Sequence, residues 1–191
     1  MERLGLFGGT FDPIHRGHLL VAQAATEEFQ LDRVIFIPAA RSPFKPDAPP
    51  SPAATRAMLL KLALAGQPRY EVDEQELRRP GISYSIDTVR DYVCRHPNAV
   101  LYYLIGADHV SQLPKWREAA ELARLTQFLV IPRPGQTPSS LPLPFRGEML
   151  RGFPLGVSSS QIRLRVHERL SIAELVPAAV AEAIRNNQLY L

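Results

Sequence analysis

Residues 5–18 read GLFGGTFDPIHRGH, and this stretch constrains the fold more than any other part of the chain. The apolar residues before Gly8 and Gly9 predict a short buried strand, and Pro13 begins a region that favours a helix through Gln30. The two glycines allow a tight turn and a close approach of the backbone to a ligand. We therefore expect a unit of strand, turn and helix at the start of the chain.

Two histidines, His15 and His18, lie three residues apart at the expected start of that helix. This spacing puts both imidazoles on one face, and the N–H groups and positive dipole of a first helical turn favour a polyanion at the same place. The glycine pair alone suits an ordinary turn, and the histidine pair alone suits a surface or cap feature. Together they predict a site for nucleotide phosphate. A zinc site is not favoured, since no Cys/His cluster completes it and the other histidines are scattered: His96, His109 and His167.

Apolar strands alternate with helical segments along the chain. We expect further strands at residues 33–37, 70–73, 99–105, 128–131 and 155–157, and helices at residues 51–65, 85–95 and 117–124. Two more helices should begin after Ser158 and at a capping box over 171–174. The order predicts an α/β, Rossmann-like, doubly wound and mostly parallel sheet, with helices on both faces, a helical C-terminus and a single domain over residues 1–191.

In such a sheet, ligands bind beyond the carboxyl ends of the strands. The His15 region follows the first expected strand, Lys45 the second, and Asp108 the strand at 99–105. Arg133 follows the strand at 128–131, and Ser158 follows the last short strand. The sequence therefore predicts one cleft, formed by segments that are far apart along the chain.

Composition is that of an ordinary soluble globular protein, and small anionic substrates would be enough to account for its charge. The chain has 46% hydrophobic and 21% charged residues and a net charge of +3, which is too mild for a dedicated nucleic-acid binder. Its 18 prolines cluster at 38–52 and 132–154, where we expect loops near the site. One cysteine, Cys94, excludes an internal disulfide, fits a reducing compartment and is interpreted as an inert core thiol. No leader and no run of about 18 apolar residues is evident, so we expect a cytoplasmic protein without a membrane span.

The segment GGTFDPIHRGH resembles the HxGH signature of the nucleotidyltransferase α/β superfamily. In this long form it is similar to bacterial nicotinate-nucleotide adenylyltransferases, which join nicotinate mononucleotide to the adenylyl group of ATP. Further similar segments follow in order over nearly the whole chain: Ser42–Lys45, Ser83–Thr88, Ile105–Asp108 with Trp116, Pro132–Pro134 and Val157–Arg163. The resemblance implies a product, nicotinate adenine dinucleotide (deamido-NAD), with release of pyrophosphate, in NAD biosynthesis.

Adenylyl transfer by direct in-line attack needs no covalent enzyme intermediate, so the protein has to position two polyanions and stabilise charge. The resemblance implies catalytic roles for His15, His18 and Arg163. It implies ATP binding by the residues Gly8, Gly9, Thr10, Phe11, Gly17, Arg133, Ser158 and Ser159. We expect Mg²⁺ to accompany ATP, without a carboxylate cluster that would form a dedicated protein site.

The resemblance also implies a mononucleotide end. Trp116 would stack on the nicotinate ring, although a structural anchor is the alternative. Backbone N–H groups of Ser85 and Arg117 would donate to the nicotinate carboxylate. The family often has Thr and Tyr at these two positions. With arginine at position 117, a direct contact between its charged side chain and the carboxylate is a second possibility. Lys45 would contact the mononucleotide phosphate, or be a solvated charge. Asp108 would accept from a ribose hydroxyl, or cap the following turn.

Other classes of protein fit less well. Pantetheine-phosphate adenylyltransferases usually carry Thr in place of His15, and cytidylyltransferases lack the segment at 83–88 and Trp116. Class I aminoacyl-tRNA synthetases share a related element, but 191 residues leave no room for an anticodon domain. A non-catalytic nucleotide sensor is disfavoured by intact His18 and Arg163, and an RNA-binding module by the lack of aromatic residues among Lys and Arg. The expected partners are ATP and nicotinate mononucleotide; the oligomeric state stays open.

Overall fold

The computed structural model describes residues 1–41, 49–79, 81–132, 140–152 and 156–191. Its strands are β1 (Arg3–Gly9), β2 (Arg33–Pro38), β3 (Tyr70–Val72), β4 (Val100–Gly106), β5 (Gln127–Ile131) and β6 (Gly147–Met149). Its helices are α1 (Arg16–Glu28), α2 (Ala53–Leu64), α3 (Gln75–Arg78), α4 (Ser85–Arg95), the 3₁₀ helix η1 (Ala107–Lys115), α5 (Ala119–Leu125), α6 (Ser159–His167) and α7 (Ala178–Asn186).

The strands form one parallel sheet in the order β3-β2-β1-β4-β5-β6. From β1 the chain first builds outward through β2 and β3, and then returns to the other side of β1 with β4. The strand order thus reverses between β1 and β4, and a doubly wound sheet opens a crevice for ligands at such a point. The expected Rossmann-like sheet is confirmed.

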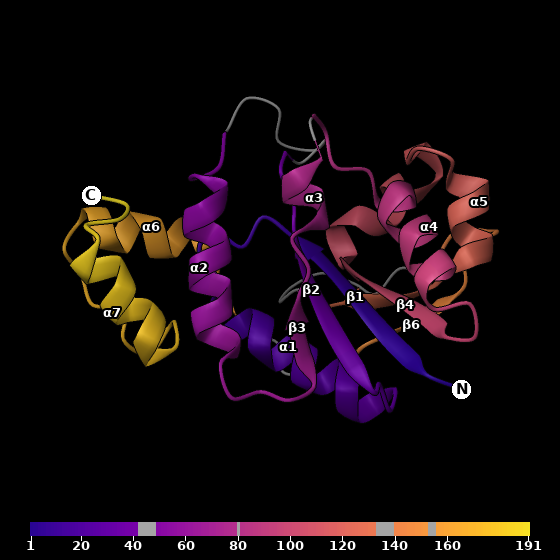
Figure 1. Cartoon of the computed structure of the whole chain (residues 1–191), viewed down its shortest axis with the longest axis horizontal. Coiled ribbons are helices and arrows are strands. Elements are labelled where there is room, and N and C mark those ends of the chain that lie inside the picture. Colours follow the sequence, from indigo (N-terminus) through magenta and orange to yellow (C-terminus); the bar gives the residue numbers. More distant parts are fainter. Residues whose placement is uncertain (42–48, 80, 133–139, 153–155) are drawn as a thin grey trace.

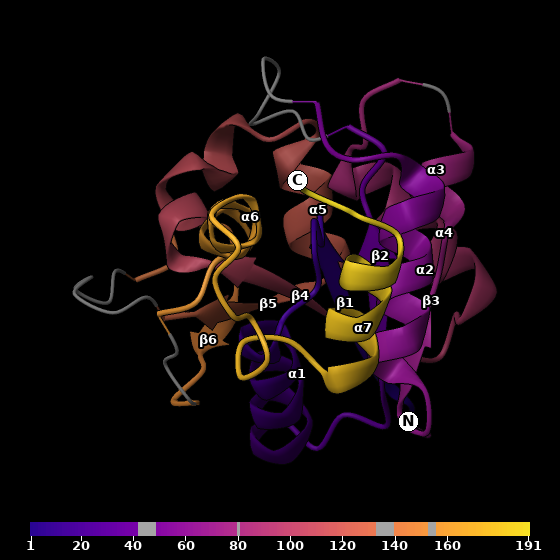
Figure 2. The same cartoon turned by 90° about the vertical axis from the view of Figure 1, so that its left-hand side faces the viewer.

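Helices cover both faces of this sheet (Figures 1 and 2). Because side chains alternate along each strand, neighbouring residues enter different cores. Phe7 and Leu104 pack with α1, α2 and α7 on one face, whereas Leu6 and Ile105 pack with α4, η1 and α5 on the other. The strands are buried on both faces, which explains the nearly continuous apolar run over 99–105.

Three expected elements differ from the structure. α1 begins at Arg16 and not near Pro13, because the segment before it forms an irregular loop. The last helix begins at Ala178, since residues 171 and 172 have no regular structure and residues 173–175 form a turn instead of a first helical turn. The sixth strand lies at 147–149 and not at 155–157, of which residue 155 lies outside the described residues while 156 and 157 have no regular structure.

The sixth strand carries no apolar alternation in its sequence, Gly-Glu-Met, which is why periodicity misses it. Gly147 belongs there for a steric reason: a Cβ on this residue would lie 1.9 Å from the backbone oxygen of Phe128 in β5. The single cysteine also differs from expectation. Cys94 lies on α4 as predicted, but its side chain is exposed and not part of a core.

Candidate functional site

The two histidines lie at the start of α1, where the sequence places them. His15 is the N-cap residue, with extended backbone angles, and His18 is the third helical residue. Their rings stack with centroids 3.7 Å apart, so the prediction of a shared face is confirmed. The backbone N–H of His15 donates to Nδ1 of His18 at 3.2 Å, which assigns the proton of a neutral His18 ring to Nε2.

Small residues and an aromatic ring hold these imidazoles. A Cβ on Gly17 would lie 3.0 Å from Nδ1 and Cε1 of His15, so glycine lets the buried ring lie against the first turn without a shift of the ring. Phe11 packs edge-on against His18, with ring centroids 5.0 Å apart. The histidines are therefore fixed by packing as well as by the helix start.

Gly8 and Gly9 are the last two residues of β1 and do not form the turn that the sequence suggests. The chain turns over 10–15, where Phe11 adopts a left-handed φ of 48°. A side chain would not fit at either position, since a Cβ on Gly8 would lie 2.7 Å from the hydroxyl oxygen of Tyr103 in β4 and one on Gly9 would lie 2.9 Å from the ring of Phe11. The two glycines therefore let neighbouring side chains pack against the end of β1, and the close approach of a ligand to this backbone stays a prediction.

The N-terminus of α6 packs against the loop before α1. Ser158 is its N-cap and accepts a hydrogen bond from the backbone N–H of Gln161 at 3.2 Å, as the predicted serine cap requires. The hydroxyl of Ser159 donates to the backbone oxygen of Pro13 at 2.8 Å. Arg163 therefore lies near the histidine motif, although Ser158 does not follow a strand as the sequence suggested.

A cavity of about 320 Å³ lies beside the carboxyl ends of β1 and β4, at the point where the strand order reverses. Six of the residues predicted to bind nucleotides line it: Gly8, Gly9, Thr10, Ser85, Trp116 and Arg117. They come from β1, the loop after it, the first residue of α4 and the two residues after η1. One cavity thus joins the segment Gly8–Thr10 to the segments expected at the mononucleotide end. The predicted residues His15, His18, Ser158, Ser159 and Arg163 are not among the described residues that line it.

Aromatic side chains form much of the wall of this cavity. Trp116 packs edge-on to Tyr103, with ring centroids 6.2 Å apart. The hydroxyl groups of Ser85 and Tyr103 lie 2.8 Å apart, and burial raises the pKa of Tyr103, which stays a neutral phenol. The Arg117 guanidinium carbon lies 4.7 Å from the ring centroid of Tyr84, a cation–π contact.

The cavity also contains a buried acid that sequence reasoning missed. Glu76 on α3 lines the cavity and is 4% exposed. Its carboxylate accepts a hydrogen bond from the Thr88 hydroxyl at 2.6 Å, and burial raises its pKa despite this bond. A glutamate in a short helix gives no periodic signal, so only the tertiary fold reveals that it faces the cavity.

The structure places three predicted residues neither in the cavity wall nor around the histidine pair. Lys45 and Arg133 lie outside the described residues. Asp108 lies in the first turn of η1 with a carboxylate oxygen 3.8 Å from Nε2 of His109, beside the described residues that line the cavity and not among them. Across the described ranges, no group of three or more His, Cys, Asp or Glu residues is placed to hold a metal ion.

Comparison with known proteins agrees with the site. Residues 6–165 match a family model described as cytidylyltransferase-like. The structure resembles that of Plasmodium falciparum nicotinic acid mononucleotide adenylyltransferase complexed with NaAD, with a TM-score of 0.80, 16% identity and coverage of 100% of this chain and 98% of the other, which shows a shared fold. The fold and the site define a nucleotidyltransferase of the cytidylyltransferase-like class.

Curated relatives narrow the family. A probable nicotinate-nucleotide adenylyltransferase of Synechococcus sp. is 40% identical over 197 residues, which cover 100% of this chain and 98% of the relative. A protein of the same name from Opitutus terrae is 40% identical over 190 residues, which cover 98% of this chain and 97% of the relative. The chain belongs to the nicotinate-nucleotide adenylyltransferase family, as the sequence motifs indicated.

Within the described part of the chain, no helix has the length and apolar character that crossing a bilayer demands.

Proposed function

We propose that this chain transfers the adenylyl group of ATP to nicotinate mononucleotide, giving nicotinate adenine dinucleotide and pyrophosphate. The observation that carries the proposal is the cavity that joins Gly8–Thr10, near the histidine pair, to Ser85 and Trp116. A dinucleotide product has to span a phosphate site and a site for its pyridine ring, and these two ends supply both. The names of the relatives support the same reaction.

At the triphosphate end, three residues act as catalytic donors. The imidazoles of His15 and His18 donate hydrogen bonds to the phosphates of ATP and stabilise the charge that develops as pyrophosphate leaves. Arg163 on α6 supplies a fixed positive charge to the same phosphates. Ser158 and Ser159 add hydroxyl and backbone donors at the helix start. The phosphate oxygen of the mononucleotide attacks the α-phosphorus in line, and no enzyme nucleophile is needed.

The remaining ATP contacts come from backbone and loops. Gly8 and Gly9 let the nucleotides approach the end of β1, and Thr10, Phe11 and Gly17 shape the loop and first turn beside the phosphates. Arg133, which follows β5 in the sequence, is assigned to ATP as well.

At the pyridine end, the ring stacks on Trp116. The nicotinate carboxylate accepts hydrogen bonds from the backbone N–H groups of Ser85 and Arg117, and the first turn of α4 adds a favourable dipole. Lys45 is assigned to the mononucleotide phosphate and Asp108 to a ribose hydroxyl.

Mg²⁺ enters with ATP in this proposal. Apart from the Asp12 carboxylate, whose oxygens accept from Ser51 and Tyr190, the described side chains around the histidine pair are mainly imidazole, hydroxyl and guanidinium groups, which suit phosphate oxygens and not a hard cation. The phosphates themselves would therefore provide the oxygen ligands, and the ion would supply charge neutralisation there.

We also propose that residues 1–191 act as one domain, in the cytoplasm, on small-molecule substrates and without nucleic acid or membrane partners. The absence of any pair of cysteines for a disulfide supports a reducing compartment.

The test is pyrophosphate release by the purified protein with ATP and Mg²⁺, given nicotinate mononucleotide, nicotinamide mononucleotide or phosphopantetheine in turn. We expect turnover with the pyridine mononucleotides and faster turnover with the acid. Turnover only with a non-pyridine acceptor would reject the proposal.

A further inference from the structure

The penultimate residue of the chain, Tyr190, contacts the loop that precedes the histidine motif. Its hydroxyl donates a hydrogen bond to Oδ1 of Asp12 at 2.8 Å, across 178 positions of sequence. Burial and the neighbouring Asp12 carboxylate raise the pKa of Tyr190, which keeps the phenol protonated as a donor. The C-terminal end of the chain is therefore bonded to the loop over 10–13.

The second oxygen of Asp12 binds another distant segment. Oδ2 accepts from the backbone N–H of Ser51, just before α2, at 3.0 Å. Arg56 on α2 is 1% exposed and donates to the backbone oxygens of Thr10 at 2.8 Å and Ser51 at 3.0 Å. Burial lowers the pKa of Arg56, and the Asp12 charge opposes that shift. Asp12 thus connects the loop to both α2 and the C-terminus.

The backbone of the same loop is held from another direction by α6. Arg163 donates to the backbone oxygen of Asp12 at 2.7 Å, and Ser159 donates to that of Pro13 at 2.8 Å. A movement of Asp12 would therefore be transmitted through this bond to Arg163, and through the chain to His15 at the start of α1.

We propose that Tyr190 is a positioning residue for adenylyl transfer: its hydrogen bond to Asp12 holds the loop over 10–13, and through it His15 and Arg163, in the geometry of the reaction. The inference rests on the proposed function. Tyr190 is not among the described residues that line the cavity, so removing its hydroxyl should affect turnover and leave binding of the pyridine ring unchanged.

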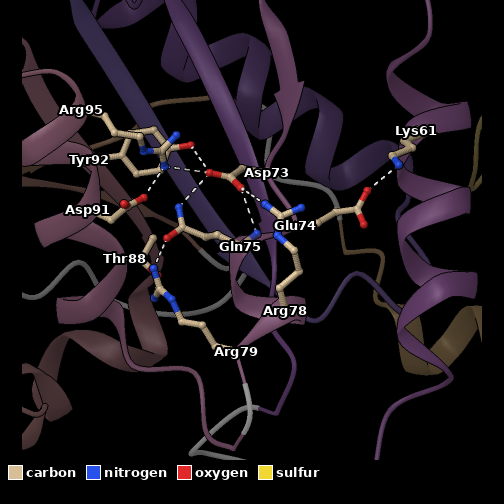
Figure 3. Close-up of polar contacts among 10 residues, drawn as sticks. All are labelled: Lys61, Asp73, Glu74, Gln75, Arg78, Arg79, Thr88, Asp91, Tyr92 and Arg95. Carbon is tan, nitrogen blue, oxygen red and sulfur yellow. Dashed lines mark hydrogen bonds and ion pairs between the residues drawn. The ribbon is translucent and has the colours of Figure 1, made fainter.

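The chain offers a matched control in a second bond of the same kind. The hydroxyl of Tyr92 on α4 donates to Oδ2 of Asp73, also at 2.8 Å, and burial raises the pKa of Tyr92 as well. Figure 3 shows this pair inside a polar cluster where Arg95 and Gln75 bind the same carboxylate. Loss of the Tyr92 hydroxyl thus removes an equivalent bond at a place that does not touch the loop over 10–13.

The experiment compares Tyr190→Phe with Tyr92→Phe in the full-length chain. We expect similar decreases in Tm, because each variant loses one hydrogen bond to a carboxylate. Tyr190→Phe should lower kcat about 10-fold, which is less than the roughly 100-fold loss that a 1 Å misplacement of reacting groups can cause. Its KM for nicotinate mononucleotide should stay within about twofold, and Tyr92→Phe should keep kcat within about twofold.

Asp12→Asn, alone and combined with Tyr190→Phe, tests the route of the effect. If Tyr190 acts through Asp12, the losses in kcat should be non-additive, with the double variant close to Asp12→Asn alone. Equal kcat for Tyr190→Phe and Tyr92→Phe, or strictly additive losses with Asp12→Asn, would overturn the inference while the wild-type turnover still stands. A wild type without adenylyl transfer would instead reject the proposed function, and the inference with it.

Discussion

Arg163 on α6 donates through Nη1 to the backbone oxygen of Asp12 at 2.7 Å, and so joins two segments that are 151 positions apart in the sequence. Nη2 of the same guanidinium lies 3.3 Å from the Ser160 hydroxyl oxygen. A guanidinium carries five N–H donors in a rigid fork, so Arg163 can hold the loop and donate to phosphate at the same time. On the proposed function, Arg163 would therefore connect the position of the loop to phosphate binding.

Arg163→Ala should chiefly weaken the handling of ATP, because Arg163 is assigned to the triphosphate end. We expect kcat/KM for ATP to fall at least about 10²-fold, as the loss of a charged transition-state donor implies, with a much smaller change in KM for the mononucleotide. Arg165→Ala on the same helix is the control, since Arg165 bonds to the backbone oxygen of Ser171. A change confined to the KM for the mononucleotide would show that Arg163 acts on the mononucleotide and not on the triphosphate.

His18→Ala should lower turnover roughly 10²-fold or more through loss of a phosphate donor. The fold should persist, which circular dichroism and Tm can verify. His96→Ala is the matched control, because His96 lies 3.2 Å from a Glu2 carboxylate oxygen and away from the histidine pair. Near-normal turnover of a folded His18→Ala protein would refute the phosphate role.

Arg56→Met should destabilise the protein by about 3 kcal/mol or more, because it removes a buried positive charge near Asp12 and leaves two backbone oxygens without their donor. Urea unfolding measures the free energy. Arg33→Met provides the comparison, since Arg33 pairs with Glu2 and Glu71 near the surface and its loss should cost less than about 1 kcal/mol. Equal losses of unfolding free energy in the two variants would show that the buried Arg56 contacts stabilise the protein no more than the surface ion pairs of Arg33 do.

The sequence predicts those parts of the fold that depend on local pattern. The apolar run over 99–105 predicts β4, and α4 begins at Ser85 as expected. The serine cap at Ser158 is also local, since a side chain bonds a backbone group three residues away. Short motifs identify the family because they too are local in the sequence.

The sequence fails where long-range contacts decide the structure. β6 forms because residues 147–149 pair with β5, and not because of any apolar alternation. Glu76 faces the cavity only because α3 packs beside α4 through Thr88. The Tyr190–Asp12 bond joins the two ends of the chain, and no periodicity or motif spacing encodes such a contact.

Glu76 should make stability depend on pH. Burial raises its folded-state pKa above the unfolded value, so its contribution is fully present below the unfolded pKa and is lost as pH rises through the folded pKa. Glu76→Gln keeps an oxygen to accept from Thr88 but cannot ionise. The free energy of unfolding of Glu76→Gln relative to wild type should therefore increase between about pH 4 and pH 7. A difference that does not change over this range would show that Glu76 carries no raised pKa.

The preference for acid over amide can be tested at Trp116 and Arg117. Both pyridine rings stack equally well, so Trp116→Ala should raise KM for nicotinate and nicotinamide mononucleotide alike, by roughly 10-fold, and leave the ratio of their kcat/KM values unchanged.

Substitution of Arg117 tests whether backbone N–H groups or the Arg117 side chain recognise the nicotinate carboxylate. Its guanidinium already lies over the Tyr84 ring, so we expect the backbone N–H groups of Ser85 and Arg117 to do most of the discrimination. Arg117→Ala should then lower the ratio of kcat/KM for acid over amide by less than about threefold. A fall of about 10-fold or more would assign the discrimination to the guanidinium, and equal use of both mononucleotides by the wild type would reject carboxylate reading altogether.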